Sequence, residues 1–259
     1  QPYLDLLKLL GKEELVTSPH ALYRYSAVLG LAAILTAAVL IPVGMPPPLQ
    51  NAGDLVVFIY LITLAAVMVV VSGLASDSPY ASIGASREVM MLLTVEPVIL
   101  IALISMAVKA QSTQFSDIMA WQASHPPALS TLLAGLTLFI AIIAQLARLP
   151  FDIVEADQEI MEGPFIEQSG PKLALFKWMF YAKQFIFAAV LISLFLPWPV
   201  FSSAPLNLLL TLLKMVVLLI IVAVVHVVNP RLRIDQAVRF FLILIVIELA
   251  GLALAVAGS

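Results

Sequence analysis

The chain has 259 residues, of which 62% are hydrophobic and 11% are charged, and its formal net charge is -3. Several apolar runs reach the ~20 residues that a membrane-spanning helix needs, so this composition is typical of a polytopic membrane protein. The charge gives no reason to expect a nucleic-acid partner, and no P-loop, dinucleotide fingerprint or HExxH metal motif is present. The absence of cysteine excludes disulfides and the thiolate ligands that iron–sulfur clusters normally need, so we expect no cofactor or metal in this chain.

Seven apolar segments are predicted to cross the membrane, so the fold class is an all-α membrane helix bundle in a single integral-membrane domain, 1–259. A stretch over 2–15, with leucines at helical intervals, is predicted to lie on the membrane surface. Asp54 is the predicted N-cap of the second span. The regions 73–88 and 109–127 are predicted to be polar loops. The seven spans are 21–41, 55–71, 89–108, 128–147, 173–196, 206–228 and 240–257.

Lysine and arginine residues alternate between successive connections. They occupy positions 8–24, Arg87, the edges of 148–177 and the connection 229–239, whereas the intervening loops hold only Lys109. Such residues accumulate on the cytoplasmic side of short loops. The acidic 148–172 loop and the basic 229–239 loop are therefore predicted to face the cytoplasm.

The segment 148–170, RLPFDIVEADQEIMEGPFIEQSG, is unusually rich in charge for so apolar a chain. Pro150 is tolerated in a first helical turn and Gly163-Pro164 ends a helix, so a short amphipathic helix is predicted between them. Four acids spaced at i, i+3, i+7 and i+10 would line one face of it. A solvated surface face is the alternative interpretation. The four acids are Asp152, Glu155, Glu159 and Glu162.

Four ionisable residues lie inside predicted spans, where a charged group costs about 2.5 kcal/mol or more and is usually functional. Glu96 precedes Pro97, which is predicted to kink its helix. A chain of titratable groups that moves protons is the functional interpretation. In the structural alternative the lysines extend toward the membrane surface and Glu96 pairs with a basic neighbour. The residues are Glu96, Lys183, Lys214 and Glu248, and His226 near a helix end is either a proton relay or an interface histidine.

Four stretches resemble, in order, the membrane subunit that respiratory complex I shares with the group 4, energy-converting [NiFe] hydrogenases. They are QPYLDLLKLLGKEE at the N-terminus, GASREVMMLLTVEP at 84–97, the 148–170 segment and NPRLRIDQAVR at 229–239. Glu162-Gly163-Pro164, LALFKW at 173–178 and Lys183-Gln184 are more similar to the hydrogenase anchor subunits. The chain departs from the family at Gln168, where a tyrosine is usual. The family also begins with one further span, so eight spans are expected in the intact protein.

The resemblance implies a membrane anchor and coupling subunit that contains no redox centre of its own, in the cytoplasmic membrane of a prokaryote. It implies partners that carry [NiFe] and iron–sulfur clusters: hydrogenase large and small subunits, a ferredoxin-like iron–sulfur subunit and an antiporter-like membrane subunit. The expected proton- or ion-coupling residues are Arg87, Glu96, Arg148, Asp152, Glu155, Glu159, Glu162, Glu167, Lys183, Lys214 and Glu248. The expected partner-docking residues are Lys172, Arg231, Arg233 and Asp235.

Two other functions remain open from the sequence. One is the quinone-chamber subunit of a complex I-like NADH:quinone oxidoreductase. The other is a free-standing secondary transporter in which the buried acids are the ion sites. The lack of a visible inverted repeat and the presence of the acidic loop count against the transporter.

Overall fold

A computed structural model gives the fold, and it describes residues 2–15, 18–49, 53–154, 161, 163–201 and 203–258. Over these residues the chain is almost entirely α-helical, which confirms the predicted fold class. The helices are α1 (Pro2–Leu10), α2 (Ala21–Leu40), α3 (Leu55–Leu74), α4 (Pro79–Ala110), α5 (Phe115–Ser124), α6 (Leu129–Gln145), α8 (Gly170–Phe195), α9 (Ala204–Val228) and α10 (Ile234–Ala257). A short 3-10 turn, η2, covers Gly163–Phe165.

Six of the described helices are long and apolar enough to cross a membrane: α2, α3, α4, α8, α9 and α10. Helix α6 is also apolar but has 17 residues, which corresponds to about 26 Å at the usual rise per residue. All seven apolar segments predicted from the sequence are therefore helical. The chain is a multi-pass membrane bundle.

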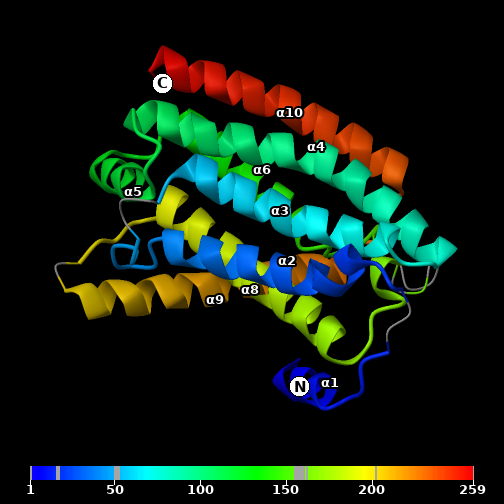
Figure 1. The fold of residues 1–259 in the computed structure, drawn as a ribbon. Helices are drawn as coiled ribbons and strands as arrows, with labels where there is room; N and C mark the ends of the chain where they lie inside the picture. The colour runs from blue at the N-terminus through cyan, green and yellow to red at the C-terminus, as the bar shows by residue number, and fades with distance from the viewer. Residues whose placement is uncertain are drawn as a thin grey trace.

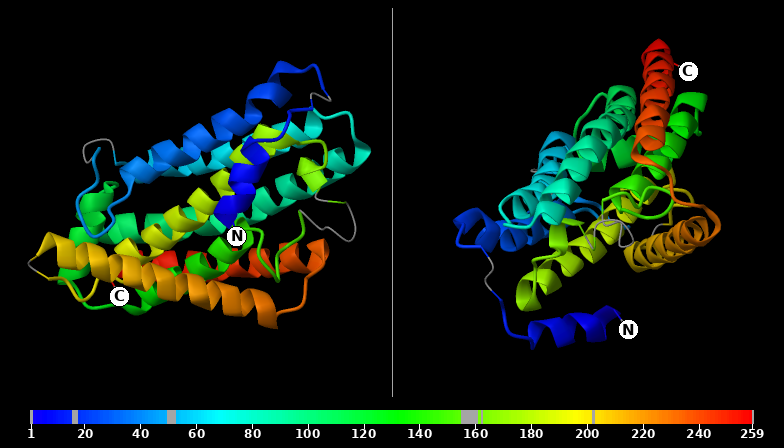
Figure 2. Two further views of the ribbon diagram at one scale, coloured as in Figure 1. Left: turned by 90° about the horizontal axis from the view of Figure 1, so that it is seen from below. Right: turned by 90° about the vertical axis from the view of Figure 1, so that its right-hand side faces the viewer.

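Helices α10, α4, α3 and α2 lie beside one another in that order, and α8 packs against α2 on the other side (Figure 1). Helix α6 contacts α4, α8 and α10, so it closes the centre of the bundle. Helix α9 packs mainly on α8 and leaves most of its apolar surface uncovered, as suits a helix that faces lipid. Helix α1 lies outside the bundle against α8, with Leu4 and Leu7 exposed (Figure 2).

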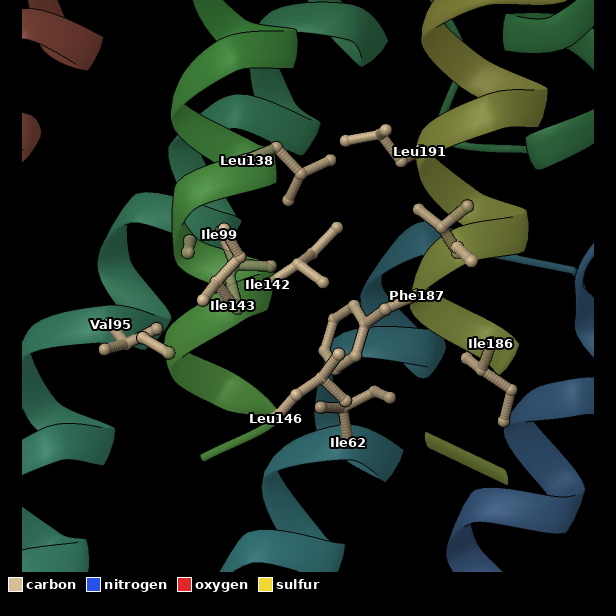
Figure 3. Close-up of a cluster of buried hydrophobic side chains, with 14 of the residues drawn as sticks. Ile62, Val95, Ile99, Leu138, Ile142, Ile143, Leu146, Ile186, Phe187 and Leu191 are labelled. Carbon is tan, nitrogen blue, oxygen red and sulfur yellow. The ribbon is translucent and has the colours of Figure 1, made fainter. Parts of the chain in front are cut away.

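The centre of the apolar core lies where α3, α4, α6 and α8 meet (Figure 3). Ile62, Ile142, Leu146 and Phe187 point toward one another there, and all four side chains are buried. Close packing of this kind leaves little room for water and gives a low local dielectric constant. Any charged side chain beside this core needs a partner within the protein.

The connections gather at two opposite ends of the bundle. At the first end, the amide of Leu232 donates a 2.9 Å hydrogen bond to the carbonyl oxygen of Pro150. At the second end, Trp198 Nε1 donates a 3.2 Å hydrogen bond to the carbonyl oxygen of Ala123. The first end contains the described residues 11–15, 18–20, 75–78, 146–154, 163–169 and 229–233, and the second contains 41–49, 111–114, 125–128 and 196–201. The grouping of the connections at two ends agrees with the alternation of basic residues along the chain. That the first end faces the cytoplasm stays a prediction.

Residues 79–88 were predicted to be a loop, and this prediction is wrong. Helix α4 begins at Pro79, in the first-turn position that suits proline. It has 32 residues in all and continues through Pro97 to Ala110. Small residues explain why this polar stretch is helical, because Ala81, Gly84 and Ala85 are buried where α4 meets its neighbours. The low mean hydropathy of residues 79–88 thus comes in part from small side chains at a close helix contact, and it does not indicate a loop.

Two further loops contain helices. Helix α5 lies within the predicted loop 109–127, with Phe115 and Ile118 fully buried. Helix α10 begins at Ile234, so it takes up the second half of the basic 229–239 loop. The predicted N-cap at Asp54 is confirmed, because its side chain accepts a 2.9 Å hydrogen bond from the amide of Val56.

The helix predicted to start at Pro150 does not start there. Residues 150–154 have an irregular backbone, and Phe151, Ile153 and Val154 are buried. The Phe151 ring packs against the Phe241 ring with 4.9 Å between centroids. The buried residues Phe151 and Ile153 lie on both sides of the partly buried Asp152. A surface helix with one buried face would not bury residues in this pattern. Glu155, Glu159 and Glu162, the rest of the predicted acidic stripe, lie outside the described residues.

Candidate functional site

Lys183 lies in the middle of α8, and its side chain is only 2% exposed. It follows the start of the helix by 13 residues, which places it about 20 Å into the bundle. A buried ammonium group must be compensated by opposite charge or hydrogen bonds. The opposite charges that act on Lys183 are on α4, where the carboxylates of Glu88 and Glu96 attract it at a range longer than a contact ion pair.

Glu88 and Glu96 lie two turns apart on α4, about 12 Å along the helix axis. Their carboxylates also interact with each other, so the two acids and Lys183 form one electrostatic group. We call these three residues the charged cluster. With two acids and one base, its formal charges balance when one carboxyl group holds a proton. Such an arrangement can accept and release a proton without exposing a net charge larger than one to the apolar core.

Glu96 is half-buried, and the Thr63 side chain of α3 is its polar neighbour. Its Oε1 atom is buried and has no hydrogen-bond partner among the described residues. A small cavity that it shares with Thr63 and Phe187 has about 10 Å³ of space, close to the size of one water molecule. Pro97 removes one backbone donor from the next turn and leaves a carbonyl oxygen in the helix free to accept a hydrogen bond. Glu96 therefore has the polar side chain of Thr63 on one side and the apolar ring of Phe187 on another.

Glu88 lies beside a second small cavity of about 20 Å³, which has room for about one water molecule. Val154 and Phe165 close this cavity from the segment between α6 and α8. Gln145, the last residue of α6, also lines it, and its Nε2 atom has no partner among the described residues. We call the connection from α6 to the start of α8 the 146–170 segment. Glu88 is thus the member of the charged cluster that lies against this segment, at Val154 and Phe165.

Three hydrogen bonds hold the first part of this segment. Arg87 Nη1 donates to the carbonyl oxygen of Ile153 at 3.3 Å, and the Leu232 amide donates to Pro150 as described above. The Leu149 amide donates to Nδ1 of His226 at 3.0 Å. His226 therefore has a structural contact, one of the two interpretations left open by the sequence. The contact joins the 146–154 loop to the end of α9.

The turn η2 presses closely on α3 and α4. A Cβ atom on Gly84 would lie 2.7 Å from Cδ of Pro164 and 2.8 Å from Cα of Gly163, so only glycine fits at position 84. Gln168 is 5% exposed and donates from Nε2 to the Ser72 hydroxyl at 2.7 Å. The position that departs from the family pattern thus anchors the segment to α3.

The N-terminal residues cross the last part of the segment. Lys172 forms a 2.7 Å ion pair with Glu14, and its Nζ atom lies 5.1 Å from the centre of the Tyr23 ring. The Tyr23 hydroxyl donates to the carbonyl oxygen of Glu167 at 2.7 Å. Lys172 was expected to dock a partner, and the structure places its side chain, 6% exposed, inside this N-terminal contact.

The remaining predicted residues are distributed as follows. Arg148 and Arg231 are partly exposed at the first end, and Arg233 and Asp235 are exposed beside them. Lys214 lies near the second end, where Nζ donates to the carbonyl oxygens of Leu196 at 2.8 Å and Trp198 at 2.5 Å, which corresponds to a helix-capping contact. Glu248 is fully buried between α10, α4 and α6, apart from the charged cluster. Asp152 and Glu167 are partly buried in the segment.

Glu88 is not among the residues predicted from the sequence, because it falls at the edge of a predicted loop. Its signal was its spacing from Glu96, since two acids eight residues apart lie on nearby faces if one helix carries both. The sequence predicts functional roles for Glu96 and for Lys183, but it does not show that the two are near each other. Only the packing of α4 against its neighbours brings the three groups together.

Residues 1–256 match the NADH dehydrogenase family. The chain is 34% identical over 252 residues to formate hydrogenlyase subunit 4 of Escherichia coli (strain K12), which covers 92% of this chain and 81% of that protein. It is 33% identical over 236 residues to hydrogenase-4 component C of the same strain, covering 86% of this chain and 74% of the relative.

A solved structure gives the same architecture. The membrane-bound sulfane sulfur reductase, an archaeal respiratory membrane complex, contains a chain that matches with a TM-score of 0.90 at 26% identity. The match covers 98% of this chain and 86% of that one. The resemblance inferred from the four sequence stretches is confirmed. The chain belongs to the NADH dehydrogenase family and is a multi-pass membrane subunit of a complex I-like or hydrogenase-type oxidoreductase complex.

Proposed function

We propose that the chain is the membrane anchor and coupling subunit of an energy-converting hydrogenase. The observation that carries the proposal is the position of Glu88, which belongs to the charged cluster and also lines a cavity closed by Val154 and Phe165. A change in the 146–170 segment would therefore act directly on a partly buried ionisable group. Similarity to two hydrogenase components supports the choice of complex.

In this proposal the redox chemistry takes place in soluble partners. The partners would hold the [NiFe] site and the iron–sulfur clusters, and these groups would supply the reduction of two protons to H2 with two electrons from a ferredoxin-like donor or from carbon monoxide or formate oxidation. Each electron transfer alters the charge above the segment. Charges in a low-dielectric bundle are poorly screened, so the change reaches Glu88 at short range. The proton held between Glu88, Lys183 and Glu96 then moves, and proton or sodium translocation follows here or in an adjacent antiporter-like subunit.

The proposed docking surface is formed by 146–154 together with 229–233. The hydrogen bond between Leu232 and Pro150 makes these two loops one surface, and Arg148, Arg231 and Arg233 supply positive charge on it. Hydrogenase large and small subunits would bind there, on the cytoplasmic side. Electrostatic complementarity at such a surface contributes mainly to orientation and to the association rate.

The proposal is tested by Glu96→Gln in the intact complex, reconstituted in vesicles. Hydrogen evolution should continue, because the catalytic metals lie in a partner, while ion uptake per H2 is lost. Full coupling in this variant would remove Glu96 from the pathway. Replacing Glu155 and Glu159 together by glutamine should impair turnover or assembly. Normal values for both would support the solvated-face interpretation of the acidic segment.

A quinone-linked complex is the second candidate function, and the match of residues 1–256 to the NADH dehydrogenase family favours it. The two are separated by purifying the native complex. Co-elution with nickel and iron–sulfur proteins, with hydrogen evolution, supports the hydrogenase. Quinone-dependent electron transfer that is blocked by quinone-site inhibitors would support the complex I-like subunit. A chain that purifies stably alone would contradict both and favour the transporter.

A further inference from the structure

Glu248 on α10 is fully buried and is not part of the charged cluster. Its Oε2 atom lies 2.5 Å from the Thr137 hydroxyl of α6, and the Ser105 hydroxyl of α4 is its other polar neighbour. Its Oε1 atom has no hydrogen-bond partner among the described residues. Three helices thus meet around one carboxyl group.

No cation faces this carboxyl group among the described residues within contact distance. Helix α6 carries no charged residue, and on α4 the charged residue on the Ser105 face is Lys109, one turn further toward the helix end. On α10 itself, the charged residues Asp235 and Arg239 lie more than two turns away, near the first end. An ionised carboxylate without a counter-charge is very unfavourable in an apolar span. The group is therefore held mainly by its two hydroxyl neighbours.

Both neighbours can serve either protonation state. Thr137 Oγ1 lies 3.1 Å from the carbonyl oxygens of Leu133 and Ala134, and Ser105 Oγ lies 2.9 Å from that of Ile101. When Glu248 is neutral, its hydroxyl donates to Thr137, which donates to its own helix. When Glu248 is ionised, Thr137 and Ser105 rotate to donate to the carboxylate, since each hydroxyl has one proton and two acceptor lone pairs. A proton can bind and leave without any shift of the backbone.

The position of the group indicates which end of the bundle it serves. Glu248 lies nine residues before the end of α10, and Ser105 lies five before the end of α4, so both are nearer the second end. Ser105 follows Glu96 by nine residues, which places the two on opposite faces of α4. On α6, Ser130 lies on the same face as Thr137, two turns toward the second end, and it is buried. Polar groups thus continue from Glu248 toward the second end.

We propose that Glu248 is a second proton-binding site, separated from the charged cluster by α4, which exchanges protons with the second end of the bundle through Thr137 and Ser105. The inference rests on the proposed coupling function for its role in turnover. The binding of a proton at Glu248 is independent of that function.

The direct test is infrared difference spectroscopy of the purified complex between high and low pH, with glutamate labelled by carbon-13. Wild type should show a protonated glutamic-acid carbonyl band that shifts in D2O, and Glu248→Gln should lose one such band. Glu96→Gln should keep the Glu248 band. If Glu248→Gln retains every glutamic-acid band, or if the band responds to sodium and not to pH, the proposal is wrong.

The functional test uses Thr137→Val and Thr137→Ser in reconstituted vesicles. Valine removes the hydroxyl, so the Glu248 band should shift and proton movement per turnover should fall, while serine should restore both. These variants keep the test valid if Glu248→Gln does not assemble. Gly251→Ala is the matched control on α10, because its Cβ atom would lie 4.0 Å from Oε2 of Glu248 and 3.8 Å from Leu133, and it should behave as wild type. Equal coupling in Thr137→Val and wild type would overturn the role in turnover. Full coupling in Glu96→Gln with loss in Glu248→Gln would contradict the proposed cluster mechanism and leave this site standing.

Discussion

Arg87 Nη1 donates a hydrogen bond to the carbonyl oxygen of Ile153 at 3.3 Å, and the next residue along α4 is Glu88. The same turn of α4 therefore holds the 146–154 loop and carries one acid of the charged cluster. In the proposed mechanism, movement of the loop would act on the protonation of the acid through this one helical turn.

Replacing Arg87 by glutamine should loosen the loop and lower coupled turnover. A hydrogen bond from a charged donor contributes about 1.5–3 kcal/mol, so the complex should also lose thermal stability. Limited proteolysis within 146–170, followed by mass spectrometry, measures the loosening. Arg24→Gln is the control, because Arg24 is exposed at the same end of the bundle. Equal cleavage rates in the two variants would contradict the anchoring role of Arg87.

Lys183→Met should destabilise the bundle strongly, because it leaves Glu88 and Glu96 without their cation. Leaving a partly buried carboxylate without the group that compensates it typically costs about 1–3 kcal/mol. Adding Glu88→Gln to Lys183→Met should recover part of the loss, since it removes one uncompensated carboxylate. The unfolding temperature of the detergent-solubilised complex gives both values. Lys177→Met is the control on the same helix, and a similar loss there would show that the effect is not specific to the charged cluster.

Glu14→Gln should release the N-terminal residues from the 163–172 region. The Lys172–Glu14 pair is buried on the lysine side and partly exposed on the glutamate side, so a loss of about 1 kcal/mol is expected. Protease cleavage between α1 and α2 should become faster, and the difference from wild type should shrink at high salt. Glu13→Gln, at the exposed neighbouring position, should leave the cleavage rate unchanged. No change in Glu14→Gln would contradict the contact.

Gly84→Ala should push η2 away from α4. The added Cβ atom would come within 2.8 Å of backbone and proline atoms of Gly163 and Pro164, and overpacking of this kind typically costs about 1–3 kcal/mol. Because η2 carries Phe165, which closes the cavity beside Glu88, turnover coupling should fall together with stability. Hydrogen exchange over 163–169 should increase. Unchanged exchange there would show that the segment adapts without moving.

The spans, the two ends and the Asp54 cap follow from the sequence because apolar run length, loop charge and capping chemistry are local properties. The helical stretch 79–88 and the buried loop 150–154 do not, because each depends on a distant partner. Gly84 has no room for a side chain because Pro164 packs against it, and Phe151 is buried because it packs against Phe241. The same reason explains why Glu88 and Lys172 could not be placed from the sequence. Glu88 interacts with Lys183 on another helix, and Lys172 forms an ion pair with Glu14.

In the proposed mechanism, Glu88 transmits changes in the 146–170 segment to the charged cluster. The most direct measurement is the ratio of ions taken up to H2 produced by vesicles that contain the complex with Glu88→Gln. We predict that hydrogen evolution persists and that ion uptake is abolished. Ion uptake per H2 equal to that of wild type would contradict the claim.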